Sequence, residues 1–237
     1  MPCVVESSVT SAGFSYSWDF GDGTALVAGA SPSHSYAAAG TYTVTLTATD
    51  KDGGKGSASA SLTVSAAAGQ GASATFVKLD TATQGNWVGA YGSDGYNVIG
   101  GPASYPSYAQ VTPSGKTDYV WKSSTTDVRA LQVPGGGRVA ATWYSRTSYT
   151  VDVNLTDGRT HGLALYLLDW DNGGLAERID VKDAVSGAAL GSWTASSFAG
   201  GEYLVLNVSG HVTIRFTRLA GADCDLSGLF FDPQWPA

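Results

Sequence analysis

The chain has 237 residues, which is enough for one large domain or two modest ones with ordinary cores. Only 14% of the residues are charged, and Gly, Ser, Thr and Ala are abundant, as in all-β proteins with many turns. The net charge of −7 argues against a nucleic-acid partner, because phosphate binding requires clustered Lys and Arg. No apolar run approaches about 20 residues, so we expect no membrane partner either.

Two strands and a tight turn are predicted near the N-terminus. Phe14, Tyr16 and Trp18 alternate with serines, which places three aromatic side chains on one face of a strand. Residues 19–23, with their glycines and aspartates, form a tight turn. Residues 42–48 then alternate apolar side chains with threonines, the pattern of a half-buried antiparallel strand.

The combined pattern of WDFGDG at 18–23, HSY at 34–36 and GTYTVTL at 40–46 resembles the PKD (polycystic kidney disease) domain. That family has an immunoglobulin-like sandwich and serves as a spacer in secreted bacterial enzymes. The resemblance implies an extracellular, secreted, modular protein of bacterial type. A complete domain has a further strand before this motif, so we expect the domain to be truncated at its start.

The composition changes between residues 66 and 73, which are small and uncharged and read as a flexible linker. We therefore expect a PKD-like domain over residues 1–65 and a second domain over residues 74–237. The second domain reads as strands joined by glycine-rich turns, which predicts a jelly-roll β-sandwich. Its segment 161–170 is apolar at both parities and is expected to form a central strand. Asp157-Gly158 is interpreted as a hairpin turn, placing His161 opposite Asn154.

The second domain resembles the non-catalytic β-sandwich carbohydrate-binding modules of secreted bacterial enzymes. The resemblance rests on the opening segment 76–80, the aromatic loop 85–96, the turn 168–172 and the closing segment 228–232. It implies a polysaccharide partner and a catalytic domain elsewhere in the natural protein. We expect a monomer.

The aromatic loop is the first candidate binding site. Trp87, Tyr91 and Tyr96 supply flat rings on a glycine-rich backbone, and the apolar faces of sugars stack on such rings. The alternative is that Trp87 and Tyr96 anchor the loop into the core, as most large aromatic residues do.

A second candidate is the polar turn that contains Asp169, Trp170 and Asp171. Its aspartates invite comparison with a calcium-binding helical loop, but Gly173 stands where a ligand belongs and strands flank the segment. A sugar-contacting role or a plain turn is therefore favoured. The resemblance to carbohydrate-binding modules separately implies a structural Ca²⁺ between the first and last strands, where Asp80 and Asp232 are the matching positions.

Catalysis has weaker support, because the sequence contains no GxSxG nucleophile motif. Paired carboxylates for glycoside hydrolysis would have to come from Asp152, Asp169, Asp171 and Asp180. A lyase would use His161 with Tyr144 or Tyr166. We expect a non-catalytic polysaccharide-binding module, with a small polysaccharide hydrolase or lyase and a cell-surface adhesion module as the alternatives.

Overall fold

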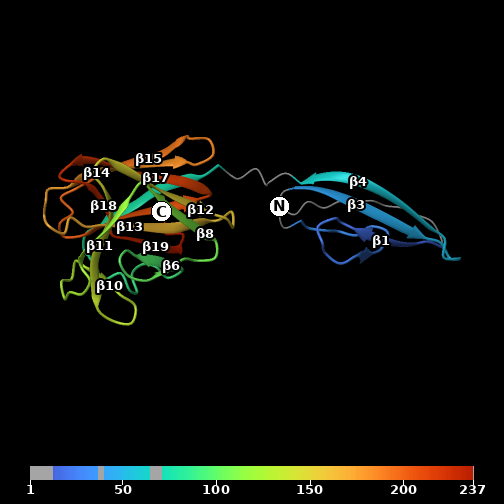
Figure 1. Cartoon of the computed structure of the whole chain (residues 1–237), viewed down its shortest axis with the longest axis horizontal. Helices are drawn as coiled ribbons and strands as arrows, with labels where there is room; N and C mark the ends of the chain where they lie inside the picture. The colour runs from blue at the N-terminus through green and yellow to red at the C-terminus, as the bar shows by residue number, and fades with distance from the viewer. Residues whose placement is uncertain (1–12, 37–39, 65–70, 237) are drawn as a thin grey trace. The chain divides into compact units, whose positions relative to one another are not determined.

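The computed structural model describes residues 13–36, 40–64 and 71–236, and every regular element in these ranges is a β-strand (Figure 1). These ranges contain no helix long and apolar enough to cross a membrane. The chain divides into two compact units, Met1–Gly69 and Gln70–Ala237. The all-β prediction is confirmed. Residues 66–70 of the predicted linker lie outside the described residues, whereas its last residue, Ser73, already belongs to a strand.

The first unit is a four-stranded antiparallel sheet in the order β2-β1-β3-β4. The strands are β1 Ser15–Asp19, β2 Val27–Ala28, β3 Gly40–Thr49 and β4 Lys55–Val64. Its small core contains the buried side chains Trp18, Phe20 and Val44. Tyr36 packs against this core and donates a hydrogen bond from its hydroxyl to the Phe20 carbonyl.

The WDFGDG motif has a local physical explanation. Gly21 has a φ of +73°, and a Cβ there would lie 2.5 Å from the Thr43 carbonyl oxygen, so only glycine fits. Asp22 accepts a hydrogen bond from Thr24 and lies 2.7 Å from His34 Nε2. The motif residues therefore build the turn that leads out of β1.

The second unit is a β-sandwich of two large antiparallel sheets. The six-stranded sheet runs β5 Ser73–Asp80, β16 Glu202–Ser209, β13 Thr160–Leu167, β19 Gly228–Pro233, β6 Gly95–Val98 and β7 Ala103–Ser104. The five-stranded sheet runs β15 Ala189–Ser196, β14 Ala176–Asp183, β17 His211–Ala220, β12 Ser148–Leu155 and β8 Ala109–Ser114. One continuous apolar core joins side chains from both sheets.

A smaller sheet lies at one end of this unit (Figure 1). It contains β10 Leu131–Gln132, β11 Arg138–Ser145 and β18 Cys224–Leu226, with β9 Thr117–Lys122 also paired to β11. The pairing of β11 with β18 brings together segments that are about 80 residues apart in the sequence. These strands carry the aromatic hollow described below.

Strand β13 is central, as predicted, and is buried on both faces between β16 and β19. Leu163 and Leu165 occupy one face, and Tyr166 occupies the other. The Tyr166 face is covered by loops: the Tyr166 hydroxyl donates to the Arg129 carbonyl, and the Tyr203 hydroxyl donates to the Gln84 carbonyl. A loop cover over a sheet face explains why both parities are apolar.

The hairpin predicted at Asp157-Gly158 is wrong. Strand β12 pairs with β17 and β8, whereas β13 pairs with β16 and β19, so the turn carries the chain from one sheet to the other. The residue opposite Asn154 is His211. His161 Nε2 lies instead 2.9 Å from Asp157 Oδ2, so the Asp157 carboxylate orients the imidazole ring. Turn residues specify that the chain bends, but not which sheet the next strand joins.

Candidate functional site

One face of the small sheet presents aromatic and acidic side chains. Tyr119 of β9 lies opposite Thr142 of β11, and Tyr144 lies opposite Asp225 of β18. Residues directly opposite in an antiparallel pair share a face, and Trp121, two residues after Tyr119, lies on that face too. The alternate positions Trp143 and Leu226 are buried in the core. The sheet therefore packs one face on the core, while its other face carries these aromatic and acidic side chains.

This face forms a hollow with a volume of about 500 Å³, which we call the aromatic hollow. It is lined by Tyr119, Trp121, Thr142, Tyr144, Arg146, Asp171, Ala222, Asp223 and Asp225. The Tyr119 ring centroid lies 5.9 Å from that of Trp121 and 6.3 Å from that of Tyr144, with interplanar angles of 83° and 82°. Tyr119 is 52% exposed. The plane of the Tyr119 ring is thus nearly perpendicular to the planes of both neighbouring rings.

Trp170 supports this hollow from the side. Its ring is stacked with that of Trp121, with centroids 6.4 Å apart and an interplanar angle of 25°. The Arg129 guanidinium lies 4.6 Å from the Trp170 ring and donates a hydrogen bond to the Trp170 carbonyl. Arg129 is itself held by an ion pair with Asp127 at 2.8 Å. The chain Asp127–Arg129–Trp170 therefore fixes the orientation of the Trp121 ring.

The three acidic groups of the hollow differ in exposure: Asp171 is exposed, Asp223 is partly buried and Asp225 is buried. Asp225 is 1% exposed, and its Oδ1 atom has no hydrogen-bond partner among the described residues. Burial, followed by the charges of Asp223, Asp169 and Asp171, raises the pKa of the Asp225 carboxyl to about 8. Burial also raises the pKa of Asp223. A cleft with strongly shifted acids is a candidate functional site.

Glu177 lies behind the hollow. Its side chain is fully buried, and its Oε2 atom accepts a hydrogen bond from the Asp225 backbone N–H at 2.6 Å. Burial raises the pKa of the Glu177 carboxyl well above its usual value, and the Asp225 charge acts in the same direction. Glu177 therefore holds the Asp225 backbone in place and adds an acid to this end of the sandwich.

The predicted polar turn lines the hollow with Asp171, whereas Trp170 and Asp169 have supporting roles. Asp171 lines the hollow directly, and Trp170 supports Trp121. Asp169 is buried, and its carboxylate accepts backbone N–H groups from Gly173, Gly174 and Leu175 at 2.7–3.1 Å. Asp169 thus stabilises the turn itself, which agrees with the plain-turn alternative for this residue. Its oxygens accept hydrogen bonds from protein donors.

The aromatic loop has a different position from the one expected for a binding site. Trp87 and Tyr91 are each 4% exposed, and Tyr96 packs partly buried against Trp87 with ring centroids 4.7 Å apart. The Trp87 indole N–H donates to the Gln132 carbonyl, and Tyr91 stacks on Tyr203. These rings cover the outer face of the six-stranded sheet. The anchoring alternative therefore describes Trp87, against which the partly buried Tyr96 packs. Tyr91 is buried as well, and neither Trp87 nor Tyr91 offers a free face to a sugar.

The calcium ion expected between Asp80 and Asp232 stays a prediction, and both carboxylates have protein donors in this structure. Asp80 accepts hydrogen bonds from the backbone N–H groups of residues 82 and 83 and from the hydroxyls of Thr83 and Tyr91. Asp232 is buried and accepts the backbone N–H groups of residues 92 and 93. Both carboxylates tie the aromatic loop to the sheet. Within the described ranges, no three His, Cys, Asp or Glu side chains gather as metal ligands would.

The candidate catalytic residues are dispersed. Asp152 contacts His211 and Thr213. Asp180 of β14 accepts hydrogen bonds from Arg178 of the same strand and from Ser192 of β15. His161 stacks on Tyr108 with ring centroids 3.7 Å apart, and it lies on the face of β13 opposite to Tyr166.

Of these candidates, Asp171 and Tyr144 line the aromatic hollow. His161 has Asp157 and Tyr108 as its neighbours. The pairing of His161 with Tyr166 is therefore wrong.

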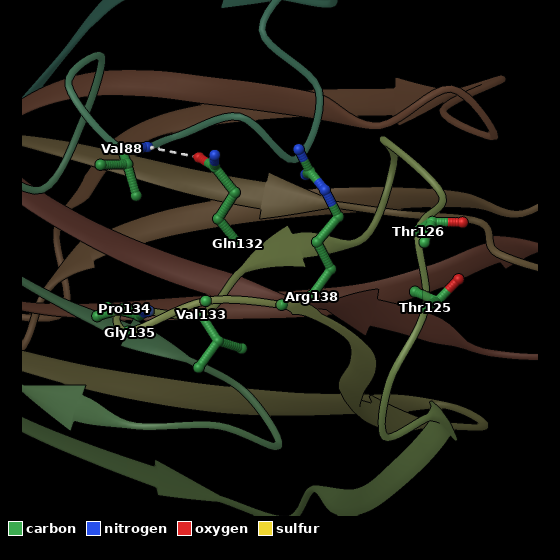
Figure 2. Close-up of a pocket in the computed structure, with 10 residues that line it drawn as sticks. Val88, Thr125, Thr126, Gln132, Val133, Pro134, Gly135 and Arg138 are labelled. Atoms are coloured by element: carbon green, nitrogen blue, oxygen red, sulfur yellow. Dashed lines mark hydrogen bonds between the residues drawn. The ribbon is translucent and has the colours of Figure 1, made fainter.

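A second hollow of about 520 Å³ lies over the glycine-rich turn 135–137 (Figure 2). Gln132 reaches across it and accepts a hydrogen bond from the Val88 backbone N–H at 3.2 Å. Arg138 donates to the Ala130 carbonyl at 2.8 Å and to the Asn86 side chain. All ten lining residues are described, and none of them is aromatic or acidic. Its polar groups are used to hold the loops together, so it is the weaker candidate.

Residues 5–66 match the family model of the PKD domain, and the first unit is therefore a PKD domain. It is similar to the PKD1 domain of Vibrio anguillarum Epp, with 30% identity over 27% of this chain and 93% of that chain and a TM-score of 0.21. No curated protein matches the chain.

Other structural neighbours are carbohydrate-binding modules. One, from the β-sandwich superfamily, is 16% identical over 98% of this chain and 95% of its own, with a TM-score of 0.28. A family 35 module from Clostridium thermocellum is 15% identical over 53% of this chain and 92% of its own, with a TM-score of 0.32. At these identities and scores, the similarity carries no argument about what this chain binds.

Sequence reasoning missed most of the aromatic hollow, namely Tyr119, Trp121, Asp223 and Asp225, and it named Tyr144 only as a partner of His161 in a lyase. The signal that could have found two of them is the spacing of Tyr119 and Trp121, which share a parity in a short segment bounded by Asp118 and Lys122. Asp225 lies opposite Tyr144 because β11 pairs with β18, and no local sequence pattern predicts that pairing.

Proposed function

We propose that the second unit binds polysaccharide in the aromatic hollow. The observation that carries this proposal is the set of partly exposed aromatic rings that line the hollow together with carboxyl groups. The rings are those of Tyr119, Trp121 and Tyr144, and the carboxyl groups are those of Asp171, Asp223 and Asp225. Sugar rings present apolar C–H faces that pack on aromatic rings, and their hydroxyls donate hydrogen bonds to carboxylates. Concave sites that are mostly apolar with a few convergent polar groups are the usual form of a small-ligand site.

The setting that we propose is a secreted, extracellular protein in which this module is joined to a catalytic domain. The PKD domain would act as the spacer. Binding of the module to an insoluble glycan would raise the local concentration of the attached enzyme on its substrate, without any new contact at the catalytic site. The module itself would release no sugar.

Affinity electrophoresis in gels that contain different polysaccharides tests the proposal. At least one glycan should retard the wild-type chain, and Trp121→Ala should reduce that retardation several-fold to tenfold, since a stacking ring contributes on the order of 1 kcal/mol. Tyr105→Ala is the matched control, because Tyr105 is a 36% exposed ring that does not line the hollow.

Two outcomes would contradict the proposal. Equal retardation of the wild type and Trp121→Ala would place binding elsewhere. Release of soluble sugar by the wild type would favour the hydrolase or lyase alternative, and Asp171→Asn, Asp223→Asn and Asp225→Asn would then identify the catalytic carboxylates. A chain that neither binds nor cleaves any glycan would leave the adhesion alternative.

A further inference from the structure

The aromatic hollow has an excess of acidic groups. Three carboxyl groups line it, from Asp171, Asp223 and Asp225, against the single guanidinium of Arg146. Even with Asp225 protonated, the carboxyl groups of Asp171 and Asp223 outnumber the Arg146 guanidinium, and the buried Glu177 stands directly behind Asp225. A negatively charged sugar such as a uronic acid would be repelled here, while a cationic group would be attracted.

The buried oxygen of Asp225 is an independent sign of a ligand. Asp225 is 1% exposed, it lies on the same face of the sheet as Tyr144, and it lines the hollow. Its Oδ1 atom has no hydrogen-bond partner among the described residues, although buried carboxylates in folded proteins are almost always paired. An unpaired buried acceptor at the base of an open hollow is placed to accept a donor from a bound molecule.

The rings around this acceptor suit the same kind of group. The Tyr119 ring lies edge-to-face with the rings of Trp121 and Tyr144, and all three residues line the hollow. The faces of aromatic rings attract cations, most strongly where water is excluded. A cation at the centre of the hollow would therefore meet rings on its sides and carboxylates at its base.

We propose that the aromatic hollow recognises the protonated amino group of an amino sugar, with Asp225 and Asp223 accepting its N–H groups and the rings of Tyr119, Trp121 and Tyr144 surrounding it. This inference rests on the proposed glycan binding and specifies its ligand class as a glycan with free, not acetylated, amines. An N-acetylated sugar carries no charge at this position and would leave the acids without their counterion.

Binding of the ammonium group is coupled to proton release. The pKa of the Asp225 carboxyl is about 8 in the unliganded protein, so near neutral pH the group is mostly protonated. The groups around it are Asp223, Asp169 and Asp171 in the loops, Glu177 on β14, Tyr144 on β11 and Arg146 directly after that strand. A cation held against Asp225 favours the carboxylate, so binding should expel a proton.

The test is isothermal titration of the full chain at about pH 6.5 with matched oligosaccharides. Tetramers of β-1,4-linked glucosamine and of β-linked galactosamine are each compared with their fully N-acetylated forms. We expect at least one amino form to bind and its acetylated partner to bind at least tenfold more weakly. Repetition in two buffers of different ionisation enthalpy should show up to about one proton released per bound ligand.

Variants assign the effect to the acids. Asp225→Asn and Asp223→Asn should each reduce affinity for the amino form at least tenfold. Asp118→Asn is the matched control, because Asp118 lies next to Tyr119 on β9, its side chain is exposed and paired with Lys116, and it is not part of the hollow. Trp121→Ala should weaken both forms. Circular dichroism checks that each variant is folded.

The outcomes separate this inference from the proposed function. Binding of neutral glycans through Trp121 with no preference for the amino forms would overturn the inference and leave glycan binding intact. An amino preference that persists in both Asp→Asn variants would also overturn it. Failure of every glycan, neutral or amino, to bind would overturn both proposals together.

Discussion

The buried carboxyl of Asp225 makes the stability of the second unit depend on pH. Its pKa is raised in the folded chain from 3.8 to about 8, so between these values the folded state binds a proton that the unfolded state does not. The stability contributed by the neutral carboxyl is therefore present at low pH and is lost as pH rises toward the folded pKa. Between about pH 5 and pH 9 this carboxyl alone lowers the free energy of unfolding by about 4 kcal/mol.

Asp225→Asn removes this dependence, because the amide has nearly the shape of the neutral acid and cannot ionise. Urea unfolding followed by tryptophan fluorescence measures the effect, since of the seven tryptophans only Trp18 lies in the first unit. We expect the variant and the wild type to lie within about 1–2 kcal/mol of each other near pH 5. Near pH 9 the variant should be the more stable.

The decisive quantity is the difference between the wild type and Asp225→Asn in the free energy of unfolding as a function of pH. Glu177 is also buried with a raised pKa, so the wild type retains a downward slope that the variant shares in part. Parallel curves for wild type and Asp225→Asn between about pH 5 and pH 9 would refute the reasoning. Such a result would mean that the Asp225 carboxyl is solvated or paired in solution. Glu177→Gln serves as a second variant, which should flatten the slope in the same direction.

Three further outcomes are expected. Trp87→Ala should destabilise the second unit by about 3–5 kcal/mol and lower its Tm, because a buried indole is lost, whereas Trp121→Ala should shift Tm little. A chelator should leave Tm unchanged if the Asp80 and Asp232 carboxylates bind only protein donors; a clear drop would support the calcium prediction. Limited proteolysis should cut within residues 66–73 and leave a stable C-terminal fragment, and mass spectrometry of that fragment measures the boundary.

The fold class and several of the strands could be predicted from the sequence. Alternation of apolar and polar residues over 42–48 and 149–155 marks strands because side chains alternate between the faces of a sheet. The doubly apolar segment 161–170 identified the central strand for the same reason. The PKD motif could also be read locally, because the positive φ of Gly21 and the carboxylates of the turn act within a few residues of one another.

Which aromatic residues face solvent depends on how the sheets and loops pack. Trp87 and Trp121 both follow glycines or turns and look alike in the sequence. Trp87 is buried because its loop covers the outer face of the six-stranded sheet, while Trp121 borders a hollow because the outer face of the small sheet stays open. Asp225 reaches Tyr144 through a strand pairing across about 80 residues. Burial and long-range pairing depend on how sheets stack, which local periodicity does not encode.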